Sequence, residues 1–214
     1  MDQDERLKNL FMKILAQSFG CAYICNRSIA QFNWIIPEQF SFITKKLKDM
    51  NTKNQTQIIA EPGKQELFII REFKAPRDLV FKAFTDASIL IQWVGPREMS
   101  MRYEKFEPFP GGSYRYLQTL PNGMEFGFHG VCHESTAPER IIQTFEFEGL
   151  PEKGHVVMET TKFESLPKGR TRVTVQSVFQ SVTDRDGMIQ SGMERGVVDS
   201  HERLDEVIDA GLLK

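Results

Sequence analysis

Histidines and acidic residues that could exchange protons gather in the middle of the sequence, namely His129, His133, Glu134 and His155. They fall in stretches that we expect to form strands. His129 and His133 are an even number of residues apart, so they share one strand face unless a bulge intervenes. Phe126 and Phe128 then take the opposite, inner face. The pattern therefore places both histidines on the solvent side of a sheet.

A second polar set could act as acid or base if it is buried: Tyr114, Tyr116, Gln118 and Glu125. The alternatives are tyrosines hydrogen-bonded within a core and a carboxylate in solvent. The sequence contains no Ser/His/Asp nucleophile elbow, no HExxH metal motif, and no Walker or dinucleotide-binding glycine motif. Gly111 and Gly112 follow a proline and precede a strand, which is typical of a turn. We therefore predict no catalytic residue and no cofactor.

The chain has three cysteines, Cys21, Cys25 and Cys132. They are too few for a disulfide framework, which indicates a reducing compartment. Cys21 and Cys25 have no second ligand cluster near them, so two ordinary thiols are favoured over a zinc site. We predict no metal site.

The composition is that of a globular protein, with 214 residues, 40% hydrophobic residues and a formal net charge of -2. This charge gives no basic signature of a nucleic-acid binder. The most apolar run, 10–25, is interrupted by Lys13 and Gln17 and is too short to span a membrane. Acidic residues near the start argue against a secretory signal. We expect a cytoplasmic protein.

The chain divides into three zones. Residues 1–49 read as a helical extension, and residues 50–64 as a polar linker. Met50 lies at this boundary, so two alternatives remain for 1–49: a helical module, or an upstream extension from a misassigned start codon. Residues 65–214 follow one regular pattern and form the main domain.

Within the main domain we predict a strand at 66–73, two short helices at 76–84 and 86–93, and a meander of strands at 99–107, 112–119, 124–134, 139–148, 154–164 and 170–180. The short links between strands contain Pro, Gly and Asn, which indicates antiparallel pairing. Pro76 suits a first helical turn, and Asp86 suits an N-cap.

A long amphipathic helix, capped by Asp184, is predicted over 184–212. Gly192 and Gly196 lie inside it, four residues apart. A helix-interior glycine costs about 1 kcal/mol against alanine, so these two positions indicate that something approaches the helix closely.

Five segments carry a resemblance to a known family: Glu72–Pro76, Val80–Asp86, Gln92–Pro96, Pro110–Tyr114 and Pro138–Ile142. Together with the order of elements, they resemble the START-like (SRPBCC) superfamily. The resemblance is closest to the branch of the C-terminal domain of the activator of heat-shock-protein-90 ATPase, and it covers about 65–210. It implies an α+β helix-grip fold, with a curved antiparallel sheet around the C-terminal helix and a cavity between them.

The resemblance and the alternation of side chains give candidates for lining that cavity. Trp93 could gate the cavity mouth or simply cap the core, and each other residue could equally fill the core. The candidates are Trp93, Tyr114, Tyr116, Gln118, Phe126, Phe128, Phe145, Phe147, Phe179, Met188, Gly192, Met193, Gly196 and Val197.

Three functions follow from the resemblance. The first is a non-catalytic carrier or sensor of a small apolar ligand. The second is a regulator of a heat-shock ATPase, although residues 1–64 are too short to replace the N-terminal domain of such activators. The third is a cyclase- or hydrolase-type enzyme. An exposed edge strand at 66–73 or an apolar face within 1–25 could make the protein a homodimer instead of a monomer.

Overall fold

The structure is a computed structural model that describes residues 55–213. The helical extension predicted for 1–49, the alternative start at Met50, and the thiols of Cys21 and Cys25 lie outside the described residues.

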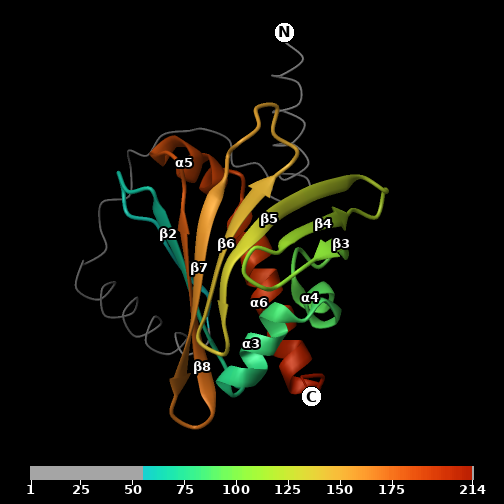
Figure 1. Ribbon diagram of the computed structural model, residues 1–214, viewed down its shortest axis with the longest axis vertical. Helices are drawn as coiled ribbons and strands as arrows, with labels where there is room; N and C mark the ends of the chain where they lie inside the picture. The colour runs from blue at the N-terminus through green and yellow to red at the C-terminus, as the bar shows by residue number, and fades with distance from the viewer. Residues whose placement is uncertain (1–54, 214) are drawn as a thin grey trace, which may run out of the picture. The chain divides into compact units, whose positions relative to one another are not determined.

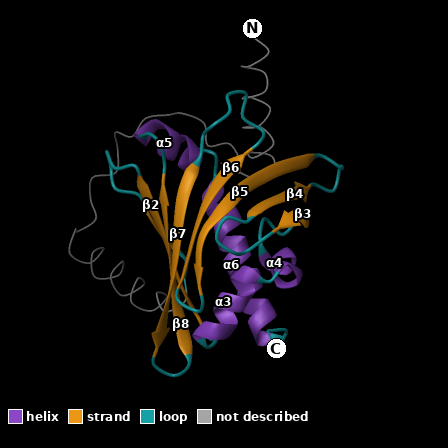
Figure 2. Cartoon of the chain, viewed as in Figure 1, coloured by secondary structure: helices purple, strands orange, loops and turns teal. Residues whose placement is uncertain are grey.

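The described chain forms one eight-stranded antiparallel sheet in the order β1-β2-β8-β7-β6-β5-β4-β3. Figures 1 and 2 show the sheet curving, with β5, β4 and β3 arching over α4 and α6. This confirms the predicted α+β class with a curved sheet around a C-terminal helix. The strands are β1 (Gln57–Ile59), β2 (Glu66–Phe73), β3 (Ser100–Phe106), β4 (Ser113–Thr119), β5 (Glu125–Thr136), β6 (Arg140–Phe147), β7 (Val157–Leu166) and β8 (Arg170–Val178), and the helices are α3 (Arg77–Thr85), α4 (Ala87–Trp93), α5 (Val182–Gln190) and α6 (Met193–Asp209).

Two expectations about the sheet are wrong. The stretch 50–64, expected to be a linker, contains strand β1, where Ile58 lies opposite Ile69 of β2. β2 is therefore not an edge strand, because β1 covers one side of it and β8 the other. Non-local pairing overrode the polar local sequence here, since a three-residue strand gives almost no pattern of its own.

The sheet has one face toward the helices, which we call the inner face. Every second residue of β2 is buried there, as the alternation of side chains along a strand requires. Phe73, Phe163 and Val173 form its main apolar core with residues of α3, α4 and α6. The helices thus cover the inner face at the end of the sheet where these residues lie.

The long C-terminal helix predicted from the sequence is in fact two helices. α5 and α6 are separated at Gly192, whose φ of 81° lies in the left-handed region that glycine adopts readily. The cap of α5 is Ser181, whose hydroxyl accepts from the N–H of Asp184 at 3.0 Å, so Asp184 is not the cap. A Cβ at Gly196 would lie 3.7 Å from Pro96, which is an ordinary van der Waals distance, so the packing there does not require a glycine.

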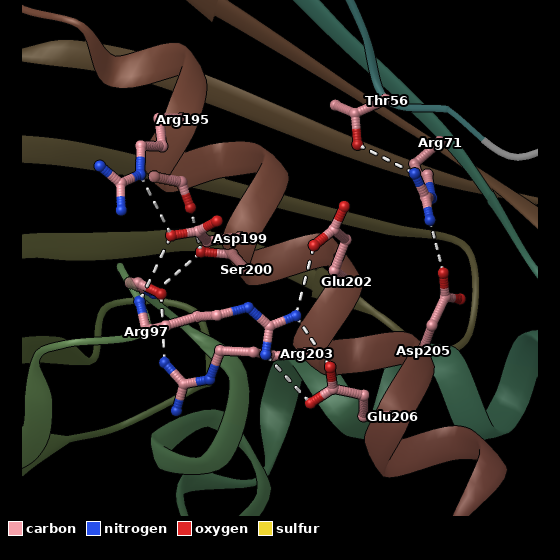
Figure 3. Close-up of polar contacts among 12 residues, drawn as sticks. Thr56, Arg71, Arg97, Arg195, Asp199, Ser200, Glu202, Arg203, Asp205 and Glu206 are labelled. Carbon is pink, nitrogen blue, oxygen red and sulfur yellow. Dashed lines mark hydrogen bonds and ion pairs between the residues drawn. The ribbon is translucent and has the colours of Figure 1, made fainter. Parts of the chain in front are cut away.

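α6 is fixed to the loop after α4 by a set of polar contacts (Figure 3). The Ser200 hydroxyl accepts from the backbone N–H of Gly95 at 2.8 Å and donates to the carbonyl of Gly196 at 2.7 Å. Arg203 donates to the carbonyls of Gln92 and Gly95 at 2.6 and 3.1 Å. These bonds hold the buried turn at Gly95 against α6.

The opposite flank of α6 is fixed to β2. The Arg71 guanidinium lies 2.5 Å from the Asp205 carboxylate, and Arg71 is only 7% exposed (Figure 3). His201 Nδ1 lies 2.9 Å from the hydroxyl of Thr56. Burial, and then the nearby Arg71 charge, lower the pKa of His201 to about 3, so its imidazole is neutral at neutral pH.

None of the helices within residues 55–213 is both long enough and apolar enough to cross a membrane.

Ser200→Ala is expected to lower the free energy of unfolding by about 1–3 kcal/mol, because it leaves the buried N–H of Gly95 without an acceptor. Urea unfolding measures the difference. Ser165→Ala, at an exposed position of β7, is the matched control and should change stability by less than about 0.5 kcal/mol. Equal effects of the two substitutions would contradict this account of how α6 is held.

Candidate functional site

Aromatic rings cross the inner face from β3 to β6 and form what we call the aromatic row: Tyr103, Tyr116, Phe128, Phe145 and Phe147. Tyr116 and Phe128 stack with ring centroids 5.0 Å apart. Phe128 lies 5.6 Å from Phe145 and 5.1 Å from Phe147. The register of β4, β5 and β6 thus brings together four of the residues that the sequence placed in a cavity.

The aromatic row is partly exposed, whereas the aromatic residues of the main core are not. Each of its five residues keeps an intermediate share of its surface accessible, while Phe73 and Phe163 are 0% and 3% exposed. The row lies next to two separate buried clusters. One contains Phe73 and Phe163, and the other contains Leu67, Val157 and Phe179 with Met188 and Met193 against it. Solvent therefore reaches this part of the inner face.

A half-buried carboxyl group, which the sequence did not single out, lies on the inner face beside the aromatic row. Glu159 of β7 is opposite Gln143 of β6 and Ser177 of β8 in the sheet register. Gln143 Nε2 donates to Glu159 Oε2 at 3.3 Å, and Ser177 Oγ donates to Oε1 at 3.2 Å. We call these three residues the polar row. It is flanked along β7 by the buried residues Val157 and Thr161.

The ionisation of the inner face is set mainly by burial. Burial raises the pKa of Glu159, and the hydrogen bonds from Gln143 and Ser177 only partly offset this. The pKa of Tyr114 is raised by burial and then by the charge of Glu159, and the pKa of Tyr116 is raised by burial, by Tyr103 and by Glu159. The register places Tyr114, Tyr116 and Glu159 on the same face of the sheet, where each can affect the pKa of the others.

Gly130 allows Tyr114 to lie across β5. The Tyr114 hydroxyl donates to the carbonyl of Thr144 in β6 at 2.7 Å. A Cβ at Gly130 would lie 2.7 Å from that hydroxyl and 1.9 Å from the Thr144 carbonyl oxygen, so no other residue fits. Tyr114 is therefore a hydrogen-bonded core tyrosine, which was one of the two alternatives for it.

The thiol of Cys132 lies near the polar row, because Cys132 pairs with Gln143 in the register of β5 and β6. The residue is 3% exposed, and burial raises the pKa of its thiol. A raised pKa keeps the sulfur protonated and unreactive at neutral pH.

Several other residues that we predicted to line the cavity lie in the core, beside a buried turn or at a helix break. Trp93 is 5% exposed, its Nε1 donates to the carbonyl of Ala83 at 3.0 Å, and its ring lies 4.8 Å from that of Phe84. It therefore caps the core and does not gate an opening. Gln118 is buried beside Gly95. Gly192 is the break between helices, and Gly196 faces Pro96, with Val197 partly buried after it.

The histidine pair does not reach the inner face. His129 lies 3.4 Å from a Glu146 oxygen and 3.2 Å from a Glu148 oxygen, with its side chain 44% exposed. The β5–β6 register shifts between Cys132 and Glu134, so a bulge does intervene beside His133, and His133 is exposed. The alternation of side chains holds up to that bulge, and both histidines are accessible to solvent.

A pocket of about 440 Å³ lies among charged residues of the outer face, and Phe126 and Phe147 also line it. Its charged residues pair with one another: Arg115 donates to Glu148 at 2.8 and 2.7 Å, and Arg102 donates to Glu125 at 3.3 Å. Glu125, a candidate acid, is thus an exposed ion-pair partner. Among residues 55–213, no group of three or more His, Cys, Asp or Glu side chains is placed to hold a metal ion.

Comparison with known proteins identifies relatives of this arrangement. Residues 74–209, more than half of the chain, match the family described as Activator of Hsp90 ATPase homolog 1-like protein. A comparison with curated proteins gives no match.

Solved structures share the fold. A Rhodobacter sphaeroides protein is 25% identical with a TM-score of 0.66, over 73% of this chain and 99% of the other. An Arthrobacter aurescens protein is 26% identical with a TM-score of 0.66, over 72% and 91% of the two chains. The AHSA1 protein of Silicibacter pomeroyi, 17% identical with a TM-score of 0.57 over 68% and 99%, is similar in fold alone.

The wild-type protein is expected to lose stability as the pH rises, because Glu159 then gives up its proton. The Glu159→Gln variant, which has no such proton, is expected to lose less. The folded protein holds the Glu159 proton to a higher pH than the unfolded chain, whose glutamates titrate near pH 4.3. The protonated form therefore stabilises the fold fully below about pH 4.3, and this stabilisation is lost as the pH rises through the raised pKa of Glu159. The free energy of unfolding falls by no more than about 1.4 kcal/mol per pH unit from this group.

Urea unfolding at about pH 5 and about pH 8 measures this difference. Glu164→Gln, at an exposed position of the same strand, is the control and should keep the wild-type pH dependence. If Glu159→Gln also keeps it, Glu159 does not hold its proton as the structure indicates.

Proposed function

The chain belongs to the Activator of Hsp90 ATPase homolog 1-like family of the START-like superfamily, and from this premise we propose that it binds a small apolar ligand on the inner face of its sheet. In this proposal the protein is a carrier or sensor and does not transform the ligand. The observation that carries the proposal is the partly exposed aromatic row between β3 and β6.

Removing the rings of the aromatic row from water provides the driving force for binding. Burial of apolar surface contributes about 25 cal/mol per Å². Aromatic side chains lose little conformational freedom on binding, and they stack on flat ligands. Met188 and Met193 are partly buried and pack against the neighbouring cluster, where flexible thioether side chains can adapt to a ligand's outline.

The arrangement of the helices also supports a ligand at this position. α3 approaches β7 and β8, whereas the principal neighbour of α6 is α4. α4 in turn approaches β3 at the edge of the sheet. α5 and α6 reach the other part of the inner face through Met188 and Met193, which pack against the same buried cluster as Phe145.

Regulation of a heat-shock ATPase is the alternative, and the name of the matched family favours it. A protein partner would bind exposed surface and would not need the inner face. Ligand binding is our first proposal because it accounts for the partly exposed aromatic row.

Phe128→Ala is expected to weaken binding of the neutral apolar dye Nile red about tenfold, because Phe128 contacts Tyr116, Phe145 and Phe147 at the centre of the row. A tenfold change corresponds to about 1.4 kcal/mol, in the range expected for a lost aromatic contact plus its buried area. Fluorescence titration of the full 214-residue chain gives the dissociation constants.

The matched control is Phe109→Ala, which removes a ring that is 56% exposed in a loop. It should bind the dye as the wild-type protein does. Thermal unfolding confirms that both variants are folded at the temperature of the titration. The proposal fails if the wild-type protein does not bind, or if both variants bind equally well.

A further inference from the structure

We propose that the ligand carries a hydrogen-bond donor, a hydroxyl group or a protonated amine, and that Glu159 accepts this hydrogen bond. The inference rests on the proposed function and adds the chemical class of the ligand. Glu159 is assigned as the residue that recognises the polar end of an otherwise apolar molecule.

The hydrogen bonds of Glu159 leave part of its accepting capacity unused. An ionised carboxylate has about four lone-pair positions, and the protonated acid keeps part of this accepting capacity. Gln143 and Ser177 occupy one on each oxygen, at 3.3 and 3.2 Å. Tyr114 does not add a third, because its hydroxyl proton is directed to the carbonyl of Thr144 at 2.7 Å. A donor on the ligand would complete this group.

The charges around Glu159 favour a donor over an anion. Arg71 is also on the inner face, but it pairs with Val173 in the register, four residues along β8 from Ser177. That separation is about 13 Å along a strand, and the Arg71 guanidinium is already bound to Asp205 at 2.5 Å. A carboxylate ligand would therefore be repelled by the ionised form of Glu159, and Arg71 is too far away to offset that repulsion.

The surroundings of Glu159 favour an apolar ring system as the rest of the ligand. Val157, next on the same face of β7, is 5% exposed and pairs with Phe145 of the aromatic row. The ring of Phe145 lies 5.6 Å from the ring of Phe128, which in turn lies 5.0 Å from the ring of Tyr116. A planar molecule that stacks on these rings would bring a substituent at its end toward the polar row. A protonated amine would also gain cation–π attraction from the rings.

Four naphthalene compounds with the same ring and different polar ends test this inference. They are naphthalene-2-methanol, its methyl ether, 2-naphthylmethylamine and 2-naphthoate, titrated by intrinsic naphthalene fluorescence against the full chain at neutral pH. We expect the alcohol and the amine, or at least one of them, to bind about five- to tenfold more tightly than the ether, as one hydrogen bond allows. The naphthoate should bind more weakly than the ether.

Two substitutions of Glu159 separate a hydroxyl donor from a charged amine. Glu159→Gln keeps an accepting oxygen without the charge, so it should retain the preference for the alcohol and lose that for the amine. Glu159→Leu removes both and should bind all of the neutral probes alike. Glu164→Gln, exposed on the same strand, should behave as the wild-type protein does.

The outcomes distinguish the two proposals. Equal binding of the ether, alcohol and amine by the wild-type protein overturns the role of Glu159 but leaves ligand binding on the aromatic row in place. The same holds if folded Glu159→Gln and Glu159→Leu variants both keep the wild-type order of affinities. If no probe and no Nile red binds, both proposals are overturned. The comparison of the four probes on the wild-type protein decides the question even if Glu159→Leu does not fold.

Discussion

The antiparallel register of β6, β7 and β8 is the constraint on which the inner face depends. It sets Gln143, Glu159 and Ser177 side by side, and two residues further along the strands it sets Val157 against Phe145. A shift of one residue in this pairing would turn all of these side chains to the other face of the sheet. The polar row, the position of the aromatic row beside it, and the burial that raises the pKa of Glu159 all follow from that register.

A carboxyl group in such a place is destabilising unless its surroundings provide partners or it keeps its proton. The inner face does both in part: two neutral donors bind Glu159, and its pKa is raised. By contrast, the buried cation on the same face, Arg71, is bound to Asp205 and helps to fix α6. Arg71 thus has a structural partner, while the half-buried Glu159 keeps unused hydrogen-bonding capacity at the edge of an accessible aromatic surface.

Much of the fold could be predicted from the sequence because its signals are local. Alternating apolar residues and turn residues predicted all seven strands from β2 to β8, and Asp86 was identified correctly as the N-cap of α4, where it accepts from Ser88. The C-terminal helix was predicted as one piece because its apolar stripe continues through the break. Only the left-handed backbone at Gly192 reveals two helices. The bulge beside His133 was missed for a similar reason, since nothing in that segment marks it.

For the candidate site, the sequence by itself determined which residues of each strand share a face. Phe126 with Phe128, and Phe145 with Phe147, follow from the two-residue period of a strand. Which strands are neighbours, and in what register, was decided only by the tertiary structure. Glu159 was therefore missed: within its own segment it is an ordinary polar residue, and its burial, its two donors and its place beside the aromatic row come from strands sixteen and eighteen residues away in the chain. Trp93 shows the same limit, because only packing against Phe84 and Ala83 decided that it caps the core.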